Sequence, residues 1–278
     1  MKNFFLITNK AKDPDGSYTE RIAEYLKAHG AAVSCAVFCR MAEHMEVPKK
    51  IECVIVLGGD GTLLKAARDM IEYEIPLIGV NLGTLGYLAE VEVGSIEQAL
   101  HMLLAGEYTQ EKRMMLTGRV FHKEDREVHD FALNDIVISR CGPLQILNFD
   151  IYVNGKFLNG YSADGIIVAT PTGSTGYNMS AGGPIVEPSA SLILLTPICP
   201  HTLNTRSIIL SSEDEVTIAI PEGREKTIQT VEASFDGTHK VTLQTGDKIM
   251  IKRASKTTGI LKLNTESFLE ILHKKMGD

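Results

Sequence analysis

A short run of glycines around one carboxylate is the strongest chemical signal in the chain. The loop Gly58–Thr62 reads Gly-Gly-Asp-Gly-Thr and follows the apolar run Ile51–Leu57. Glycines let the backbone turn sharply and let phosphate oxygens approach the peptide N–H groups without side-chain interference. An aspartate adds like charge to a phosphate cradle, so we expect the carboxylate of Asp60 to face a hydroxyl or a magnesium ion instead.

The position of this loop along the chain supports that interpretation. Residues 51–57 form a nearly continuous β-branched run, typical of a strand buried on both faces, and residues 62–73 carry leucine and alanine at helical spacing. Open α/β sheets bind ligands at the carboxyl ends of their strands, beside helix N-termini. The spacing matches neither the dinucleotide fingerprint nor the P-loop. A plain tight turn with an Asp or Thr helix cap is the structural alternative.

Three further segments carry polar groups in patterns that suit a ligand site. Residues 164–184 contain an apolar run and then crowded glycines and hydroxyls, with Tyr177 offering a ring face or a phenol. Residues 79–88 follow the next apolar strand, so we expect them at the same sheet edge as the Gly58–Thr62 loop. The pair Asn134-Asp135 opens another strand-like run. Taken alone, the last two also have ordinary structural explanations, as a strand-to-helix connection and a capping pair.

The order of the expected elements divides the chain into two parts. Strands separated by helices over roughly the first hundred residues predict an α/β N-terminal domain with a parallel sheet. The remainder is rich in strands, with turns such as Asn154-Gly155, and predicts a layered antiparallel β domain. We place the first, nucleotide-binding domain at residues 1–107 plus about 262–278, and the β domain at 108–261. The short C-terminal helix expected at Phe268–Lys275 packs back onto the first domain.

Composition and charge narrow the classes of function. The 278 residues carry a formal net charge of -7, which argues against broad electrostatic attraction to nucleic acid. No apolar run approaches the roughly 18 residues that span a bilayer, and Lys10 and Lys12 end the N-terminal apolar run too early for a signal peptide. The five cysteines are scattered and odd in number, as in proteins with reduced thiols. We therefore expect a cytoplasmic protein with no nucleic-acid and no membrane partner.

Taken together, these segments resemble the bacterial NAD kinases, the ATP- or polyphosphate-dependent NAD kinase family. The matching segments, in the family's order, are Gly58–Thr62, Leu82–Leu88, Asn134-Asp135, Asp164–Gly183 and Ile198–Leu203. The Gly-Gly-Asp-Gly-Thr loop is shared with diacylglycerol and sphingosine kinases, and a close variant occurs in phosphofructokinases. The Thr-Pro-Thr-Gly-Ser-Thr segment is far more specific to NAD kinases. This chain departs from the family at Gly176, where alanine is usual.

The resemblance implies an activity and an assembly. It implies transfer of the γ-phosphoryl of ATP, or in some members of inorganic polyphosphate, to the 2′-hydroxyl of the adenosine ribose of NAD, giving NADP. It gives Asp60 the contact with that hydroxyl. It also implies an obligate homo-oligomer, a dimer or a tetramer, in which the β domain helps to assemble the NAD site across subunits. It leaves open the choice of donor, the acceptance of NADH and feedback by NADP.

The expected site follows from these motifs and from the needs of phosphoryl transfer, which depends mainly on positioning and charge stabilisation. A free aspartate is a weak base, so we expect Asp60 to align the hydroxyl and to take its proton late. Magnesium, or another divalent metal, is expected to arrive with ATP and to be held largely by the nucleotide and water. Arg206 is a further basic candidate, and His201 is expected to hold a turn. The resemblance implies that the NAD site is lined by Asn134, Asp135, Asp164, Thr175, Gly176, Tyr177 and Ser180, with Asp236 at a further family position near the ligand. The other nucleotide-binding candidates are Gly58, Gly59, Gly61, Thr62, Lys65, Arg68, Tyr87 and Thr172.

Three alternative functions are consistent with parts of the pattern. A lipid kinase shares the first motif but needs access to a membrane through a basic amphipathic helix or an accessory domain, and this acidic chain shows neither. A non-enzymatic NAD(P) sensor that signals through its oligomer is expected to lose the catalytic carboxylate, and Asp60 is present. A phosphofructokinase is expected to be α/β in both halves, whereas the second half of this chain has the pattern of a β domain.

Overall fold

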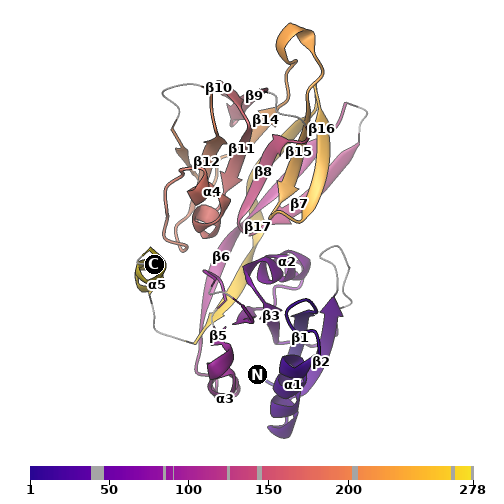
Figure 1. Cartoon of the computed structure of the whole chain (residues 1–278), viewed down its shortest axis with the longest axis vertical. Helices are drawn as coiled ribbons and strands as arrows, with labels where there is room; N and C mark the ends of the chain where they lie inside the picture. Colours follow the sequence, from indigo (N-terminus) through magenta and orange to yellow (C-terminus); the bar gives the residue numbers. More distant parts are fainter. Residues whose placement is uncertain are drawn as a thin grey trace. The chain divides into compact units, whose positions relative to one another are not determined.

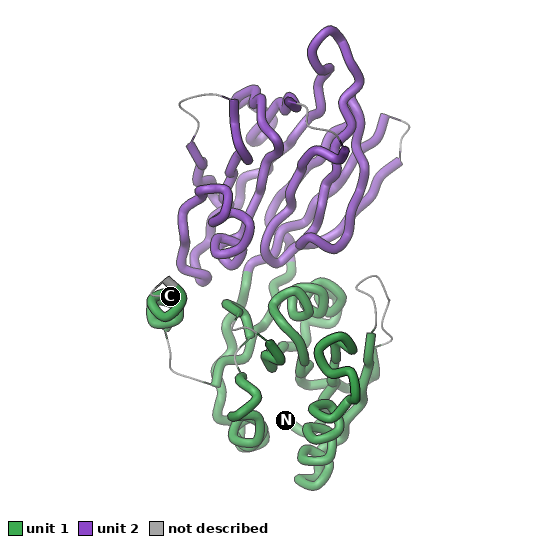
Figure 2. Tube along the Cα trace, viewed as in Figure 1, with its two compact units in different colours: residues 1–113, 256–278 green, residues 114–255 purple. Residues whose placement is uncertain are grey.

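The structure is a computed structural model of the whole chain, drawn in Figure 1. It describes residues 1–38, 47–83, 86–89, 91–123, 126–142, 146–201, 206–263 and 267–276. The chain forms two compact units, coloured separately in Figure 2: Met1–Arg113 with Lys256–Asp278, and Met114–Ser255. The domain boundaries proposed from the sequence lie near residues 107 and 262. Among the described residues, no helix has the length and apolar character needed to cross a membrane.

Unit 1 contains a parallel sheet in the order β17–β4–β3–β1–β2, with β5 paired to β4. Its strands are β1 (Asn3–Asn9), β2 (Ala32–Phe38), β3 (Cys53–Gly58), β4 (Leu77–Asn81), β5 (Val91–Glu92) and the C-terminal end of β17 (Lys248–Lys262). Every residue of β3 and β4 is buried. Strands covered on both faces need such continuous apolar runs, which explains the sequence pattern.

The helices of unit 1 are α1 (Ser17–Ala28), α2 (Asp60–Met70), α3 (Ile96–Ala105) and α5 (Phe268–Met276), with the 3-10 turn η1 (Val93–Ser95) before α3. Helix α1 buries Ile22 and Leu26 in the same apolar cluster as Phe4 and Leu6 of β1. The C-terminal helix predicted from the sequence is confirmed as α5. Its Lys275 ammonium lies 3.8 Å from the centre of a tyrosine ring in unit 1, so the helix contacts this unit.

Unit 2 contains a six-stranded antiparallel sheet in the order β13–β12–β11–β8–β15–β16. A second antiparallel group pairs β10, β9, β14 and β17, and β6 pairs with β7. The strands are β6 (Thr109–Phe121), β7 (Glu127–Ala132), β8 (Asp135–Arg140), β9 (Leu147–Val153), β10 (Lys156–Ala163), β11 (Gly165–Ala169), β12 (Leu192–Ile198), β13 (Ile208–Ser211), β14 (Val216–Ala219), β15 (Thr230–Phe235) and β16 (His239–Gln244). Short helical turns are η2 (Thr172–Thr175), α4 (Tyr177–Ser180) and η3 (Arg224–Lys226).

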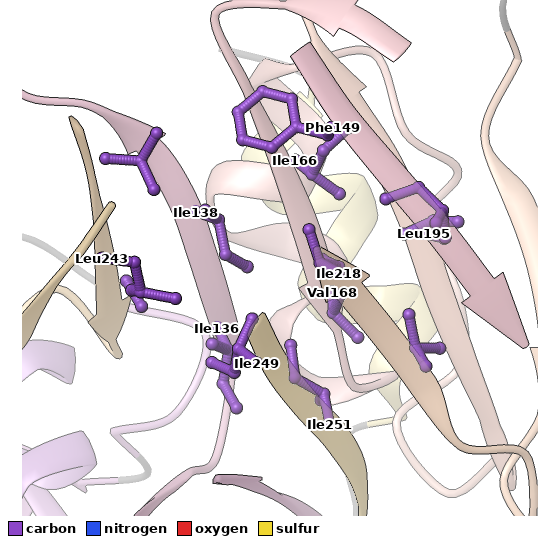
Figure 3. Close-up of a cluster of buried hydrophobic side chains, with 14 of the residues drawn as sticks. Ile136, Ile138, Phe149, Ile166, Val168, Leu195, Ile218, Leu243, Ile249 and Ile251 are labelled. Carbon is purple, nitrogen blue, oxygen red and sulfur yellow. The ribbon is translucent and has the colours of Figure 1, made fainter. Parts of the chain in front are cut away.

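The two strand groups of unit 2 share one apolar core. Ile136 and Val168 of the six-stranded sheet belong to the same buried cluster as Phe149, Ile218 and Ile251 of the second group, as Figure 3 shows. Alternating strands place every second side chain on the inner face, so two such faces bury each other. The predicted fold, an α/β domain with a parallel sheet followed by a layered antiparallel β domain, is confirmed.

Candidate active site

The Gly58–Thr62 loop is the turn between β3 and α2. Strand β3 ends at Gly58 and helix α2 begins at Asp60. The carbonyl of Gly59 accepts the N–H of Thr62 at 2.9 Å and starts the helix. A Cβ on Gly58 would overlap the Thr62 side chain, whereas no described side chain lies within 4 Å of where a Cβ would stand on Gly59 or Gly61. The space beside the Cα atoms of these two glycines is therefore open to a ligand.

The Asp60 carboxylate is fixed by the loop that follows β4. Its Oδ2 accepts the backbone N–H of Tyr87 at 2.8 Å, and its Oδ1 accepts those of Leu88 at 3.2 Å and Ala89 at 3.3 Å. A Cβ on Gly86 would overlap both carboxylate oxygens, so only glycine fits there. These bonds confirm that the two loops share one sheet edge. Thr84 and Leu85 of the same motif lie outside the described residues.

The end of β1 adds two polar groups to this edge, Asn9 and Lys12, that the sequence reasoning did not include. The Asn9 amide donates to Thr62 Oγ1 at 3.4 Å. The Lys12 ammonium would lie 3.4 Å from a Cβ on Gly83, a residue whose N–H donates to Asn81 Oδ1 at 3.0 Å. Parallel strands bring their carboxyl ends to one edge, so the rule that located the Gly58–Thr62 loop applies to the end of β1 as well.

The two basic candidates on α2, Lys65 and Arg68, are less exposed than Lys12. Lys65 is almost fully buried, forms an ion pair with Asp69 one helical turn further on, and lies 5.5 Å from the centre of the Phe38 ring. Arg68 is half-buried in the last turn of α2, away from the helix N-terminus. The described contacts of Lys65 therefore stabilise the packing of α2. Lys12 is exposed, beside the loop that follows β4.

In unit 2, the backbone of the Asn134-Asp135 pair is hydrogen-bonded to the carboxylate of Asp236, which follows β15. Asp236 Oδ2 accepts the N–H of Leu133 at 2.7 Å, and its Oδ1 accepts those of Asn134 at 2.8 Å and Asp135 at 3.1 Å. The Asp236 N–H donates back to the Asp135 carbonyl at 3.0 Å. Charge-assisted bonds of this kind are strong, so the Asp236 side chain sets the backbone of the turn between β7 and β8.

The Thr-Pro-Thr-Gly-Ser-Thr segment folds against the same turn. Thr170 donates its N–H to the Asn134 carbonyl at 2.8 Å and its hydroxyl to the Leu133 carbonyl at 2.6 Å. A Cβ on Gly173 would overlap the Asn134 carbonyl. A Cβ on Gly176 would lie 3.3 Å from Asn134 Nδ2, so this second glycine leaves more room. The segment's hydroxyls and glycines thus allow its backbone to approach the turn closely.

The cluster formed by the Asn134-Asp135 turn and the Thr170–Gly176 segment contains buried polar atoms without a hydrogen-bond partner among the described residues. Within the described residues, the buried atoms Asn134 Oδ1 and Thr172 Oγ1 have no hydrogen-bond partner. Burial, together with the charge of Asp236, raises the pKa of Asp135 to about 7. Buried polar atoms are nearly always hydrogen-bonded in native proteins, so such a group of unsatisfied atoms beside a titratable carboxyl indicates a ligand site.

The remaining candidates of unit 2 differ in their contacts and in their exposure. Asp164 faces Arg140 at 3.7 Å, and Thr175 donates its hydroxyl to the Thr172 carbonyl at 3.4 Å. Tyr177 and Ser180 are exposed on α4, and neither takes part in the described hydrogen bonds around Asn134. His201 donates its backbone N–H to the Ser162 carbonyl at 2.8 Å, a bond that does not depend on its side chain. Thr202 and Leu203 lie outside the described residues.

Asn178 is a supporting residue that the sequence reasoning missed. It is fully buried, donates to the carbonyls of Ser174 at 3.2 Å and Pro184 at 3.0 Å, and accepts the Thr196 hydroxyl at 2.7 Å. A Cβ on Gly183 would overlap its amide. The Ser-Ala-Gly-Gly stretch therefore wraps around one buried amide. The only sequence signal for this arrangement is an asparagine that stands among small residues.

The described residues contain no group of three or more His, Cys, Asp or Glu side chains that could hold a metal ion. The nearest carboxylate to the open glycines, Asp60, already accepts three N–H groups. This donor set does not fit a resident metal ion. It fits a metal that enters bound to nucleotide phosphates and water.

Comparison with protein families matches both units. Residues 8–108 match the ATP-NAD kinase N-terminal domain, and residues 133–263 match the ATP-NAD kinase C-terminal domain. The chain is 49% identical to the NAD kinase of Agathobacter rectalis, over 100% of this chain and 99% of the relative. It is 46% identical to the NAD kinase of Lachnospira eligens, over 99% of this chain and 100% of the relative.

Two solved structures share the fold. A yeast NADH kinase complexed with NADH aligns with a TM-score of 0.87 and 24% identity, covering 100% of this chain and 88% of that chain. An NAD kinase from Archaeoglobus fulgidus in complex with ATP aligns with a TM-score of 0.77 and 24% identity, covering 99% and 98%. With both units matched by the family models and full-length relatives well above 30% identity, the chain belongs to the NAD kinase family and catalyses the ATP-dependent phosphorylation of NAD.

Proposed function

We propose that this enzyme transfers the γ-phosphoryl of ATP to the 2′-hydroxyl of the adenosine ribose of NAD, with Asp60 as the residue that aligns the hydroxyl and takes its proton. One observation carries this proposal. Asp60 opens α2 beside two open glycines, and three backbone N–H groups fix its carboxylate. A carboxylate accepts up to about four hydrogen bonds, so Asp60 keeps capacity for one substrate hydroxyl.

The donor phosphates fit the same strand end. The space beside Gly59 and Gly61 is open, and both glycines lie at the N-terminus of an eleven-residue helix. Unpaired N–H groups and the helix dipole make such a terminus favourable for anions. The exposed Lys12 beside Gly83 supplies a positive charge at the same edge. We assign the donor triphosphate to these groups. Gly58, Thr62, Lys65 and Arg68 shape the loop and its helix.

Magnesium, or another divalent metal, enters this reaction as part of the nucleotide substrate in our proposal. Its role when bound is to offset the charge of the triphosphate. The protein holds the metal–nucleotide complex with backbone N–H groups and Lys12, and it keeps the Asp60 carboxylate directed at the acceptor hydroxyl. The donor is ATP, with polyphosphate as a further donor to be tested.

NAD binding is assigned to the cluster in unit 2. The unpaired Asn134 Oδ1 accepts, and Thr172 Oγ1 donates or accepts, so together they suit an amide or a ribose hydroxyl. Asp135 with its raised pKa can supply a proton donor near neutral pH. Asp236 positions both residues through the backbone. Tyr87, Asp164, Thr175, Gly176, Tyr177 and Ser180 complete the proposed nucleotide contacts.

We also propose a homo-oligomer, a dimer or a tetramer, located in the cytoplasm. Ile209 on the edge strand β13 is 56% exposed, which suits burial against a second copy. The described cysteines Cys35, Cys53, Cys141 and Cys199 are free, in agreement with a reducing compartment.

The proposed reaction is tested by incubating the protein with NAD and magnesium, with ATP and with polyphosphate in parallel. NADP is detected with a dehydrogenase that accepts only the 2′-phosphorylated dinucleotide. We expect NADP with ATP, and the polyphosphate reaction decides the donor range. A phosphorylated product that this dehydrogenase does not accept would show that another hydroxyl is the acceptor.

A further inference from the structure

The C-terminal helix reaches the residues that hold Asp60. Lys275 of α5 places its ammonium 3.8 Å from the centre of the Tyr87 ring. The backbone N–H of Tyr87 is the shortest of the three donors to the Asp60 carboxylate, at 2.8 Å. A chain of two contacts therefore links the last helix of the protein to the proposed catalytic carboxylate. All three residues belong to unit 1.

Helix α5 lies beyond the segments that match the family models, which end at residue 263. Its neighbouring basic residue, Lys274, is exposed, whereas Lys275 is half-buried. Burial lowers the pKa of Lys275, and the charge of Asp60 opposes that shift by favouring the ammonium. An ammonium over a tyrosine face is attracted by the ring quadrupole, and the attraction grows as water is excluded.

We propose, on the basis of the function proposed above, that Lys275 is a positioning residue for phosphoryl transfer, which holds Tyr87 and thereby keeps the Gly86–Ala89 backbone on the Asp60 carboxylate. It acts through the ring of Tyr87 and through its positive charge near Asp60. It needs no contact with either substrate. The Tyr87 side chain and its N–H group point to different partners, so one residue joins the helix to the carboxylate.

The test compares Lys275→Gln, Lys275→Arg and the matched control Lys274→Gln, which removes the same charge one residue earlier on the helix. We expect Lys275→Gln to lower kcat for NADP formation about three- to tenfold, with KM for NAD and for ATP changed less than about twofold. Arginine also stacks on aromatic rings, so Lys275→Arg should stay within about twofold of the parent. Lys274→Gln should match the parent.

Two measurements separate positioning from other roles. In Lys275→Gln, hydrogen exchange at the Leu88 and Ala89 amides should become about fivefold faster, because their bonds to Asp60 open more often. In a double-mutant cycle, Tyr87→Leu should remove most of the effect of Lys275→Gln.

The inference is overturned if Lys275→Gln behaves like Lys274→Gln, or if it raises KM for ATP while kcat is unchanged, as for a direct phosphate contact. A Lys275→Arg variant as impaired as Lys275→Gln would also overturn it. Asp60→Asn serves as the reference: loss of turnover in Asp60→Asn with full activity in Lys275→Gln defeats only the inference, whereas full activity in Asp60→Asn defeats the proposed function.

Discussion

The carboxylate of Asp236 accepts the backbone N–H of Asn134 at 2.8 Å, although the two residues lie 102 positions apart in the chain. The same carboxylate also accepts the N–H groups of Leu133 and Asp135. One acidic side chain therefore determines the shape of the turn that presents the proposed NAD-binding pair. Asp236 is for this reason better described as the support of the proposed NAD site than as a direct ligand.

Asp236→Asn tests this support. An amide in place of the carboxylate leaves one acceptor oxygen for three N–H donors, so we expect the free energy of unfolding to fall by about 2 kcal/mol. KM for NAD should rise about tenfold or more, with a smaller change for ATP. Steady-state kinetics and urea unfolding measure both quantities. Glu222→Gln, an exposed loss of the same charge in unit 2, is the control. Equal kinetics in the two variants would remove the assigned role.

The raised pKa of Asp135 makes the free energy of unfolding depend on pH. Its pKa is raised from 3.8 to about 7, so between these values the folded protein binds more protons than the unfolded chain. The free energy of unfolding then falls as pH rises, by at most about 1.4 kcal/mol per pH unit from this group, and the loss ends above the raised pKa. Asp135→Asn removes this term. Its Tm should therefore rise relative to that of the parent between about pH 5 and about pH 8. A Tm difference that is the same at both pH values would refute the assignment.

Gly86→Ala should disable the Asp60 site without unfolding the protein. A Cβ at this position overlaps both oxygens of Asp60, so the carboxylate must move. Displacement of a reacting group by about 1 Å can cost about a hundredfold in rate, and we expect a fall in kcat of that order. Gly94→Ala is the control, since no described side chain lies near its Cβ position and Gly94 does not have a positive φ. Near-normal kcat in Gly86→Ala would contradict the close contact with Asp60.

The two glycines of the Thr-Pro-Thr-Gly-Ser-Thr-Gly stretch should respond differently to alanine. A Cβ on Gly173 overlaps the Asn134 carbonyl, which is backbone and cannot step aside cheaply. A Cβ on Gly176 meets the Asn134 amide and the Gly173 carbonyl oxygen, each at 3.3 Å, a milder contact that a small shift can relieve. Gly173→Ala should weaken NAD binding about tenfold or more, whereas Gly176→Ala should stay within about threefold of the parent. Isothermal calorimetry with NAD measures both, and the reverse order would contradict the described packing.

The sequence predicted the α/β and antiparallel β units, and it identified the Gly58–Thr62 loop and the loop after β4 as neighbours. A buried β-branched run before Gly58 and leucines at helical spacing after it are local signals, and β3 and α2 form where these signals lie. Parallel pairing then brought the loop after β4 to the same edge, because parallel strands end together. The antiparallel unit followed from its many short alternating runs.

The supporting contacts could not be predicted in the same way. The partners of Asp60 lie 27 to 29 residues further on, and those of Asp236 lie more than a hundred residues earlier. Periodicity indicates which face of an element is buried, but it carries no information on which distant N–H groups satisfy a carboxylate. Lys275 stands in no local motif, and Asn178 stands inside the Asp164–Gly183 segment, where the residue types alone do not distinguish its buried amide from the polar groups around it. Their roles became visible only through the Tyr87 ring and the buried bonds of the Ser-Ala-Gly-Gly stretch.

The turnover of Asp60→Asn, measured together with its affinity for NAD, tests the proposed role of Asp60 directly. Asparagine keeps the shape of the side chain but removes its charge and most of its ability to take a proton. We expect NADP formation with ATP and magnesium to fall at least about a hundredfold, while the Kd for NAD changes less than about threefold. Turnover within about threefold of the parent would contradict the assignment of Asp60 as the residue that aligns and deprotonates the acceptor hydroxyl.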